Sequence, residues 1–130
     1  MSDGLVTQAD LQRIIEQGEE ALLVQQAERV GRELARQLTT SQIRGIFGSV
    51  RRIELDWQNP ARAAKAQREF ALLQPRLAYQ ARRERGRGVE ELRGVLEPAM
   101  KMVENKPERF RNFVDFFEAI LAYHKAYGGQ

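Results

Sequence analysis

The chain contains no cysteine and only one histidine among its 130 residues. Without cysteine it can form no disulfide, no thiolate nucleophile and no zinc–thiolate site, which agrees with a reducing compartment. Its first ten residues are polar and include Asp3, whereas a secretory signal needs a basic start followed by an apolar block. No apolar run approaches the ~20 residues that span a bilayer. We therefore expect a cytoplasmic protein that has no membrane partner.

Side chains that perform catalysis are scarce and scattered. The single histidine, His124, ends an apolar helical stripe, so a place in the core or at an interface is the preferred interpretation. No spacing of Asp, Glu and His resembles a metal site or a general acid–base pair. Gly45 and Gly48 lie within a helical pattern that no strand precedes, so they do not form a phosphate-binding loop. These absences predict a binding protein rather than an enzyme, with no metal, cofactor or small-molecule substrate.

What the sequence does contain is helical periodicity along almost its whole length. Apolar residues recur at intervals of three and four, and no strand alternation, tandem repeat or Gly/Ser linker interrupts them. A chain of 130 residues buries one modest core. We predict an all-α fold in which residues 1–130 form a single-domain bundle of about five helices and residues 1–8 are flexible. Pro75 and Pro98 lie inside helical patterns, and each predicts a kink or a break.

Residues 39–57 predict a central amphipathic helix. The threonine and serine hydroxyls at residues 39–41 can accept a hydrogen bond from a first-turn amide. One face is apolar and is expected to line the core: Ile43, Ile46, Phe47, Val50, Ile53 and Trp57. A different face carries Arg44, Gly48, Arg51 and Leu55. A glycine between two guanidinium groups lets a rigid partner approach the backbone, although a solvated surface is the simpler interpretation of this face.

The next helical stretch, residues 61–85, follows Asn59 and Pro60, which supply a cap and a preset first-turn residue. One of its faces is apolar: Ala66, Phe70, Leu73, Leu77 and Ala81. Another face forms a basic ridge with one aromatic residue: Lys65, Arg68, Arg76, Tyr79 and Arg83. Beyond this stretch, residues 85–88 predict a short basic loop, because its two glycines favour left-handed backbone positions.

The last helical stretch, residues 107–127, is apolar on two sides. The first side carries Phe110, Phe113, Val114, Phe117, Leu121 and His124. The second side carries Phe116, Ile120, Tyr123 and Tyr127. A helix in a small bundle needs only one apolar side to cover its core. The second side is therefore predicted to be exposed in a monomer and to bind a partner. That partner can be another copy of the same chain.

The basic residues are unevenly distributed, although the net charge is only +3. Residues 1–40 hold four arginines and seven acidic residues, whereas residues 61–93 hold nine basic and four acidic residues. Arginine outnumbers lysine 17 to 4. Guanidinium groups suit phosphate, although a GC-rich coding bias gives the same usage. The excess of positive charge lies in the middle of the chain.

Three blocks, TTSQIRGIFGSVRRIE, LLQPRLAYQARR and FRNFVDFFEAILAYHKAYGG, resemble the small helical subunit of the type III-A CRISPR-Cas effector, the Csm complex. They occur in that family's order and cover about half of the chain. The resemblance implies an all-helical, non-enzymatic subunit that stacks in several copies beside the Csm backbone and large subunits. It also implies contact with the backbones of guide RNA and target RNA, which the subunit helps to hold paired in antiviral defence. Target cleavage belongs to the backbone subunit in that family.

The candidate RNA contacts are basic residues and one tyrosine: Arg44, Arg51, Arg52, Lys65, Arg68, Arg76, Tyr79, Arg82, Arg83, Arg85 and Arg87. A subunit that lies along RNA needs phosphate contacts without base readout, and Arg and Lys on rigid helices provide them. Tyr79 can stack on a base or a ribose, although the sequence favours packing in the core. Two other classes stay open. One is a helical dimeric regulator without nucleic-acid binding, and the other is a DNA-binding helix-turn-helix, for which the short glycine turn is missing.

Overall fold

The computed structural model describes residues 5–84 and 86–130, and its regular structure is entirely helical. Six helices lie within these residues: α1 (Gln8–Ile15), α2 (Glu20–Leu34), α3 (Thr40–Trp57), α4 (Ala63–Arg83), α5 (Gly88–Val103) and α6 (Pro107–Ala126). The all-helical prediction is confirmed for this part of the chain, and the predicted number of about five helices is one too low. The extra helix arises because Gly18, with a φ of +66°, separates α1 from α2.

The segment before α1 is part of the folded structure. Thr7 caps this helix, since its side-chain oxygen accepts a hydrogen bond from a first-turn amide. Val6, next to the cap, is fully buried in the core. Residues 5–8 therefore belong to the folded bundle, while the flexibility of residues 1–8 stays a prediction and residues 1–4 lie outside the described residues.

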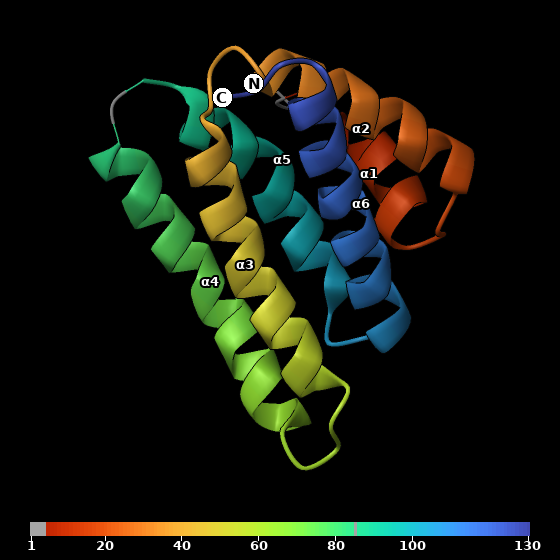
Figure 1. Ribbon diagram of the computed structural model, residues 1–130. Helices are drawn as coiled ribbons and strands as arrows, with labels where there is room; N and C mark the ends of the chain where they lie inside the picture. Colours follow the sequence, from red (N-terminus) through yellow and green to blue (C-terminus); the bar gives the residue numbers. More distant parts are fainter. Residues whose placement is uncertain (1–4, 85) are drawn as a thin grey trace.

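The helices are arranged around α5 and α6. Figure 1 shows α3 and α4 as a long antiparallel pair on one side of the molecule, with α1 and α2 on the other side of α5 and α6. The most extensive contact between helices joins α2 to α6, and the next joins α3 to α4. The α3–α4 pair packs on the bundle through its inner faces, so its outer faces are open to solvent.

Two local expectations for α4 and α5 need correction. Helix α4 begins at Ala63 rather than directly at Pro60, because the Asn59 side chain accepts a hydrogen bond from the Ala61 amide and forms a turn first. Both interior prolines are accommodated without a break, since α4 continues through Pro75 and α5 continues through Pro98. A bend at each proline stays a prediction.

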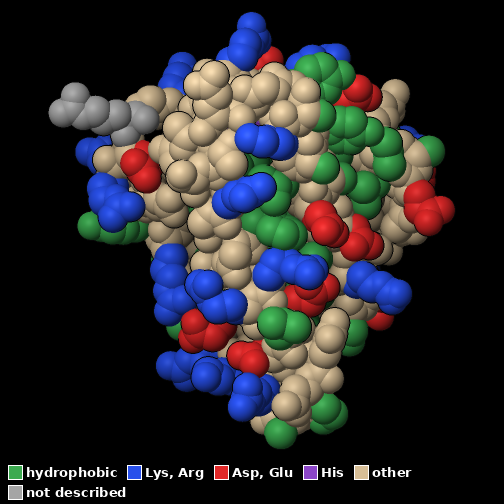
Figure 2. Space-filling view, in the orientation of Figure 1, with side chains coloured by type: hydrophobic (Ala, Val, Ile, Leu, Met, Phe, Trp, Pro, Cys, Tyr) green, Lys and Arg blue, Asp and Glu red, His purple; other side chains and the backbone are tan. Residues whose placement is uncertain are grey.

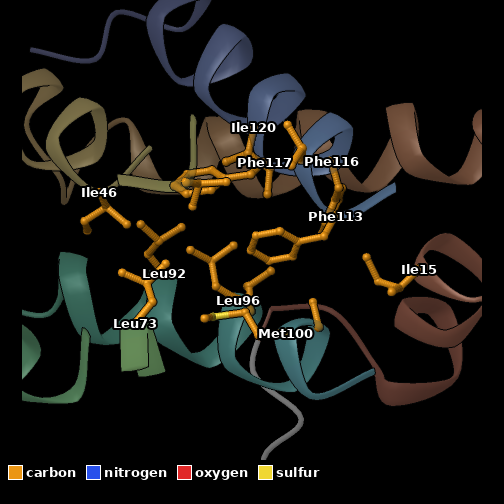
Figure 3. Packing of buried hydrophobic residues seen from close by; sticks show 14 of the residues in the cluster. Ile15, Ile46, Leu73, Leu92, Leu96, Met100, Phe113, Phe116, Phe117 and Ile120 are labelled. Atoms are coloured by element: carbon orange, nitrogen blue, oxygen red, sulfur yellow. The ribbon is translucent and has the colours of Figure 1, made fainter. Parts of the chain in front are cut away.

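The centre of the core lies between α5 and α6. Figure 3 shows Phe113 and Phe117 of α6 facing Leu96 and Met100 of α5, with side chains from α1, α3 and α4 around them. At the last residue of α3, the Trp57 ring stacks on another α6 side chain, Phe110, at 4.1 Å between centroids. This aromatic packing fixes the α3–α4 pair against α6.

The second apolar side of α6 is covered within the same chain. Phe116 and Ile120 are fully buried, because α2 packs along this side. The prediction that they form an exposed partner surface is therefore wrong. Tyr123 is partly buried, and only Tyr127, with 44% of its surface exposed, reaches solvent at the end of the helix. In the sequence alone, nothing distinguishes an apolar side covered by a neighbouring helix from one covered by another protein.

The close approach of α2 to α6 depends on Gly31. A Cβ atom at Gly31 would lie 2.7 Å from the Tyr123 Cβ and 2.8 Å from the Ile120 carbonyl oxygen. Because neither atom is the end of a flexible side chain, Gly31→Ala must push the two helices apart. We expect the free energy of unfolding, measured in urea, to fall by about 1–3 kcal/mol.

Gly94→Ala on α5 is the matched control for Gly31→Ala. A Cβ atom there would meet nothing within 4 Å. Alanine should therefore leave stability unchanged or raise it by about 0.5–1 kcal/mol through helix propensity. Equal effects of the two substitutions would contradict the close packing at Gly31.

Candidate nucleic-acid interface

Helix α3 begins at a cap that satisfies backbone groups of its first turn. The Thr39 hydroxyl accepts a hydrogen bond from the Gln42 amide at 3.1 Å, and the Gln42 side chain accepts one from the Thr39 amide at 2.9 Å. Thr39 is one of the predicted capping residues. From this start, Ile43 and Val50 point into the core and Arg44 points to solvent. Burial of the apolar side chains therefore determines which residues of α3 face outward.

The outer face of α3 is basic, and two glycines lie between its arginines. Its members are Arg44, Gly45, Gly48, Arg51, Arg52 and Leu55. A Cβ atom at Gly45 would meet nothing within 4 Å, and one at Gly48 would meet only the end of the Arg52 side chain at 4.0 Å. Packing within the chain thus does not require either glycine. Their effect is to leave the helix backbone accessible between guanidinium groups, a role that the sequence pattern suggested for Gly48.

The outer face of α4 carries most of the predicted contacts. Lys65, Arg68, Arg76, Tyr79, Arg82 and Arg83 are all exposed. In Figure 2, Lys and Arg side chains run down the side of the molecule that α3 and α4 form, with a few acidic side chains between them. Tyr79 keeps 67% of its surface exposed, so the preference for packing it in the core is wrong. The structure places these residues together because they share one side of one helix.

Three of the candidate arginines form ion pairs within the chain. Arg51 pairs with Glu54 at 2.8 Å, Arg76 with Glu69 at 3.0 Å, and Arg83 with Glu84 at 3.7 Å. The arginines of these pairs are exposed and their carboxylate partners are partly exposed. Ion pairs near the surface contribute only about 0–1 kcal/mol each, so a phosphate can replace the carboxylate at little cost. Among the described residues, no carboxylate lies within 4.0 Å of the other candidates: Arg44, Arg52, Lys65, Arg68, Arg82 and Arg87.

The predicted basic loop is shorter than residues 85–88, because Gly88 is the first residue of α5 and packs on the bundle. A Cβ atom at Gly88 would lie 2.2 Å from the Gln37 carbonyl oxygen, so only glycine permits this approach to the α2–α3 connection. Arg87 is exposed directly before this contact. Arg85, the remaining predicted contact in the loop, lies outside the described residues.

The end of α6 is tied to its neighbours by polar contacts that the sequence did not predict. The Tyr127 hydroxyl donates a hydrogen bond to the Glu28 carboxylate at 2.6 Å, and the Arg32 guanidinium lies 5.7 Å from the ring centroid. The hydrogen bond to Glu28 raises the pKa of Tyr127, and burial adds to the effect. His124 is fully buried, as expected, with Nε2 2.6 Å from the Leu38 carbonyl oxygen.

Two residues on the outer face of the α3–α4 pair were missed by the sequence analysis. Arg62 is exposed in the turn before α4, where its guanidinium lies 3.4 Å from the Asp56 carboxylate. Leu72 is 37% exposed and lies two helical turns before Tyr79. The available signal was the seven-residue spacing between Leu72 and Tyr79, which places both on one stripe.

Neither a metal centre nor a membrane-crossing helix is found in the part of the chain that the structure describes. Within residues 5–84 and 86–130, no group of three or more His, Asp or Glu side chains could hold a metal ion. In the same residues, no helix is both long enough and apolar enough to cross a bilayer.

The fold and this surface define a small all-helical protein that presents a basic surface on one pair of helices. A family model described as Csm2 Type III-A matches residues 17–130. The chain therefore belongs to the Csm2 family of type III-A systems, as the three sequence blocks suggested, and is a small subunit of the Csm effector complex together with other Csm subunits. No curated protein and no solved structure matches the chain.

Proposed function

We propose that the chain is a non-catalytic, RNA-contacting subunit that holds guide RNA paired with target RNA in the Csm complex. The observation that supports this role most directly is the exposure of the Arg and Lys side chains of α3 and α4 on the outer faces of one helix pair. The core uses none of them. A rigid pair of helices presents these charges at fixed spacing, which suits a phosphate backbone.

The proposed contacts are sequence-independent. Base pairing between the two RNA strands supplies sequence recognition, so the protein needs only to neutralise phosphates and support the shape of the duplex. In this proposal several copies of the chain stack beside the backbone and large subunits, act as single-domain units in the cytoplasm, and leave cleavage to the backbone subunit. The membership in the Csm2 family supports this arrangement.

Filter retention of labelled RNA across a salt titration tests the proposal on the free protein. We expect weak binding with no sequence preference, and a logarithm of affinity that falls linearly with the logarithm of salt concentration. The slope should be about −0.7 for each phosphate that a single strand contacts. An affinity that does not change with salt would contradict binding through phosphates.

Charge reversal tests whether RNA binding depends on the cations of the α4 surface or only on the total charge of the protein. Replacing Arg68, Arg76 and Arg83 together by Glu should abolish RNA retention and keep the helical circular dichroism spectrum, because all three are exposed. The matched control reverses three exposed cations outside α3 and α4: Arg36, Lys101 and Arg111. It changes the net charge equally and should retain binding. Equal losses in both variants would mean that only total charge matters.

The dimeric regulator without nucleic acid is the alternative that the same experiment addresses. It predicts no retention of RNA by any variant. The sequence argument for it depended on an exposed second side of α6, whose Phe116 and Ile120 are buried under α2.

A further inference from the structure

Tyr79 is the most exposed aromatic side chain among the described residues. The Arg83 guanidinium, one turn further along α4, lies 5.8 Å from the centroid of its ring. A guanidinium at this distance interacts with the face of the ring and restrains its orientation. The ring nevertheless keeps 67% of its surface open, so it is held in place without being covered.

Cations flank this ring along the helix axis. Arg76 lies three residues before Tyr79 and Arg82 three residues after it, which is about 4.5 Å along α4 in each direction. Both arginines are exposed and share the side of α4 that carries the ring. The ion pair of Arg76 with Glu69 is also exposed and can be exchanged for a phosphate contact.

We propose that Tyr79 and Arg83 form a stacking platform for one unpaired base of single-stranded RNA, with the adjacent phosphates bound by Arg76 and Arg82. This proposal rests on the proposed function and specifies the form of RNA that the α4 surface prefers. Stacking on an aromatic ring tolerates every base, because each has a π-face. A base inside a duplex already has neighbours on both faces, so it cannot use the platform. The α4 surface therefore distinguishes single-stranded from double-stranded RNA at this point.

The charge around the ring favours RNA over a protein partner. The exposed apolar residues on the same side of α4 as Tyr79 are Leu72, at 37% exposure, and Pro75. Protein interfaces place larger apolar areas at their centre and keep charged residues at the rim. Here guanidinium groups lie within one turn of the aromatic ring on both sides, which matches a polyanion with a base between two phosphates.

Three labelled probes of equal length test the platform on the full chain: an unstructured single-stranded RNA, a blunt RNA duplex, and an abasic ribose-phosphate strand. Tyr79→Ala should raise the Kd for the single strand by about ten-fold and leave the other two values unchanged. Tyr79→Phe should retain the parent value, because the ring does the stacking. A fluorescent adenine analogue in the single strand should be quenched by the parent and by Tyr79→Phe, and not by Tyr79→Ala.

Tyr127→Ala is the control, because it removes another exposed tyrosine that lies outside α4 and should change none of the three Kd values. If Tyr79→Ala binds the single strand as the parent does, while the triple charge reversal does not bind, the platform is wrong and the RNA-contacting function stands. If Tyr79→Ala weakened binding equally for all three probes, the platform would also be wrong. Tyr79 would then support the structure of the whole α4 surface rather than stack on a base. Unchanged RNA binding with lost assembly into the Csm complex would assign Tyr79 to a protein contact instead. If the parent binds none of the probes, both proposals fall.

Discussion

Phe116→Glu should prevent the protein from folding. The Phe116 side chain is fully buried where α2 packs along α6. Its loss costs about 3–5 kcal/mol as a cavity, and a carboxylate that is buried without a partner adds several more. Because a domain of this size is stable by only about 5–15 kcal/mol, the expected result is loss of the helical circular dichroism signal and of a cooperative thermal transition.

Ala122→Glu places the same side chain at an exposed position of the same helix. It should leave the thermal midpoint close to that of the parent, since exposed substitutions change stability by about 0.5 kcal/mol or less. If Phe116→Glu instead remained helical and only failed to associate with other subunits, Phe116 would have to lie at a surface. That outcome would contradict the packing of α2 on α6.

Phe113→Ala should lower the free energy of unfolding by about 3–5 kcal/mol. Phe113 is fully buried and makes edge contacts with the rings of Phe70 and Phe117, at 5.4 and 6.3 Å between centroids. Its removal leaves a cavity at a point where three helices meet, and these helices cannot all close around it. Urea denaturation should show a lower midpoint with an unchanged slope, as expected when stability changes without a change in the surface exposed on unfolding.

The matched substitution is Phe47→Ala on α3. Phe47 was predicted to lie in the core, and it makes an edge contact with Phe117 at 5.1 Å, but its side chain is only partly buried. Part of its surface already faces water, so Phe47→Ala should lower the free energy of unfolding by about half as much as Phe113→Ala. Leu55→Ala, at a position that is 68% exposed, should have almost no effect. A loss at Phe47 as large as at Phe113 would require Phe47 to be covered by something outside the monomer.

The core and the proposed RNA surface occupy opposite faces of the same two helices. The Trp57 ring of α3 and the Phe70 ring of α4 both pack on Phe110 of α6, at 4.1 and 5.1 Å between centroids. This packing restrains the position of both helices, and therefore the spacing of the cations on their outer faces. Substitutions in the aromatic cluster should thus disturb RNA binding indirectly, whereas substitutions of the cations should leave the core intact.

Much of the candidate site could be predicted from the sequence because it depends on local geometry. The period of an α-helix places Arg68, Arg76 and Arg83 on one side of α4 whatever the rest of the chain does. A capping hydroxyl such as that of Thr39 sets the start of α3 through contacts within a few residues. The family could be recognised for the same reason, since the three blocks that resemble Csm2 are continuous segments.

The relation between helices was decided only by the tertiary structure. The sequence showed that α6 has two apolar sides, but it could not show that Gly31 lets α2 approach close enough to bury Phe116 and Ile120. It also did not settle whether Tyr79 faces the core or the solvent. Helical periodicity gives the angular position of a side chain around its own axis. Which neighbour covers that position depends on contacts between residues far apart in the chain, and those contacts exist only after the helices have packed.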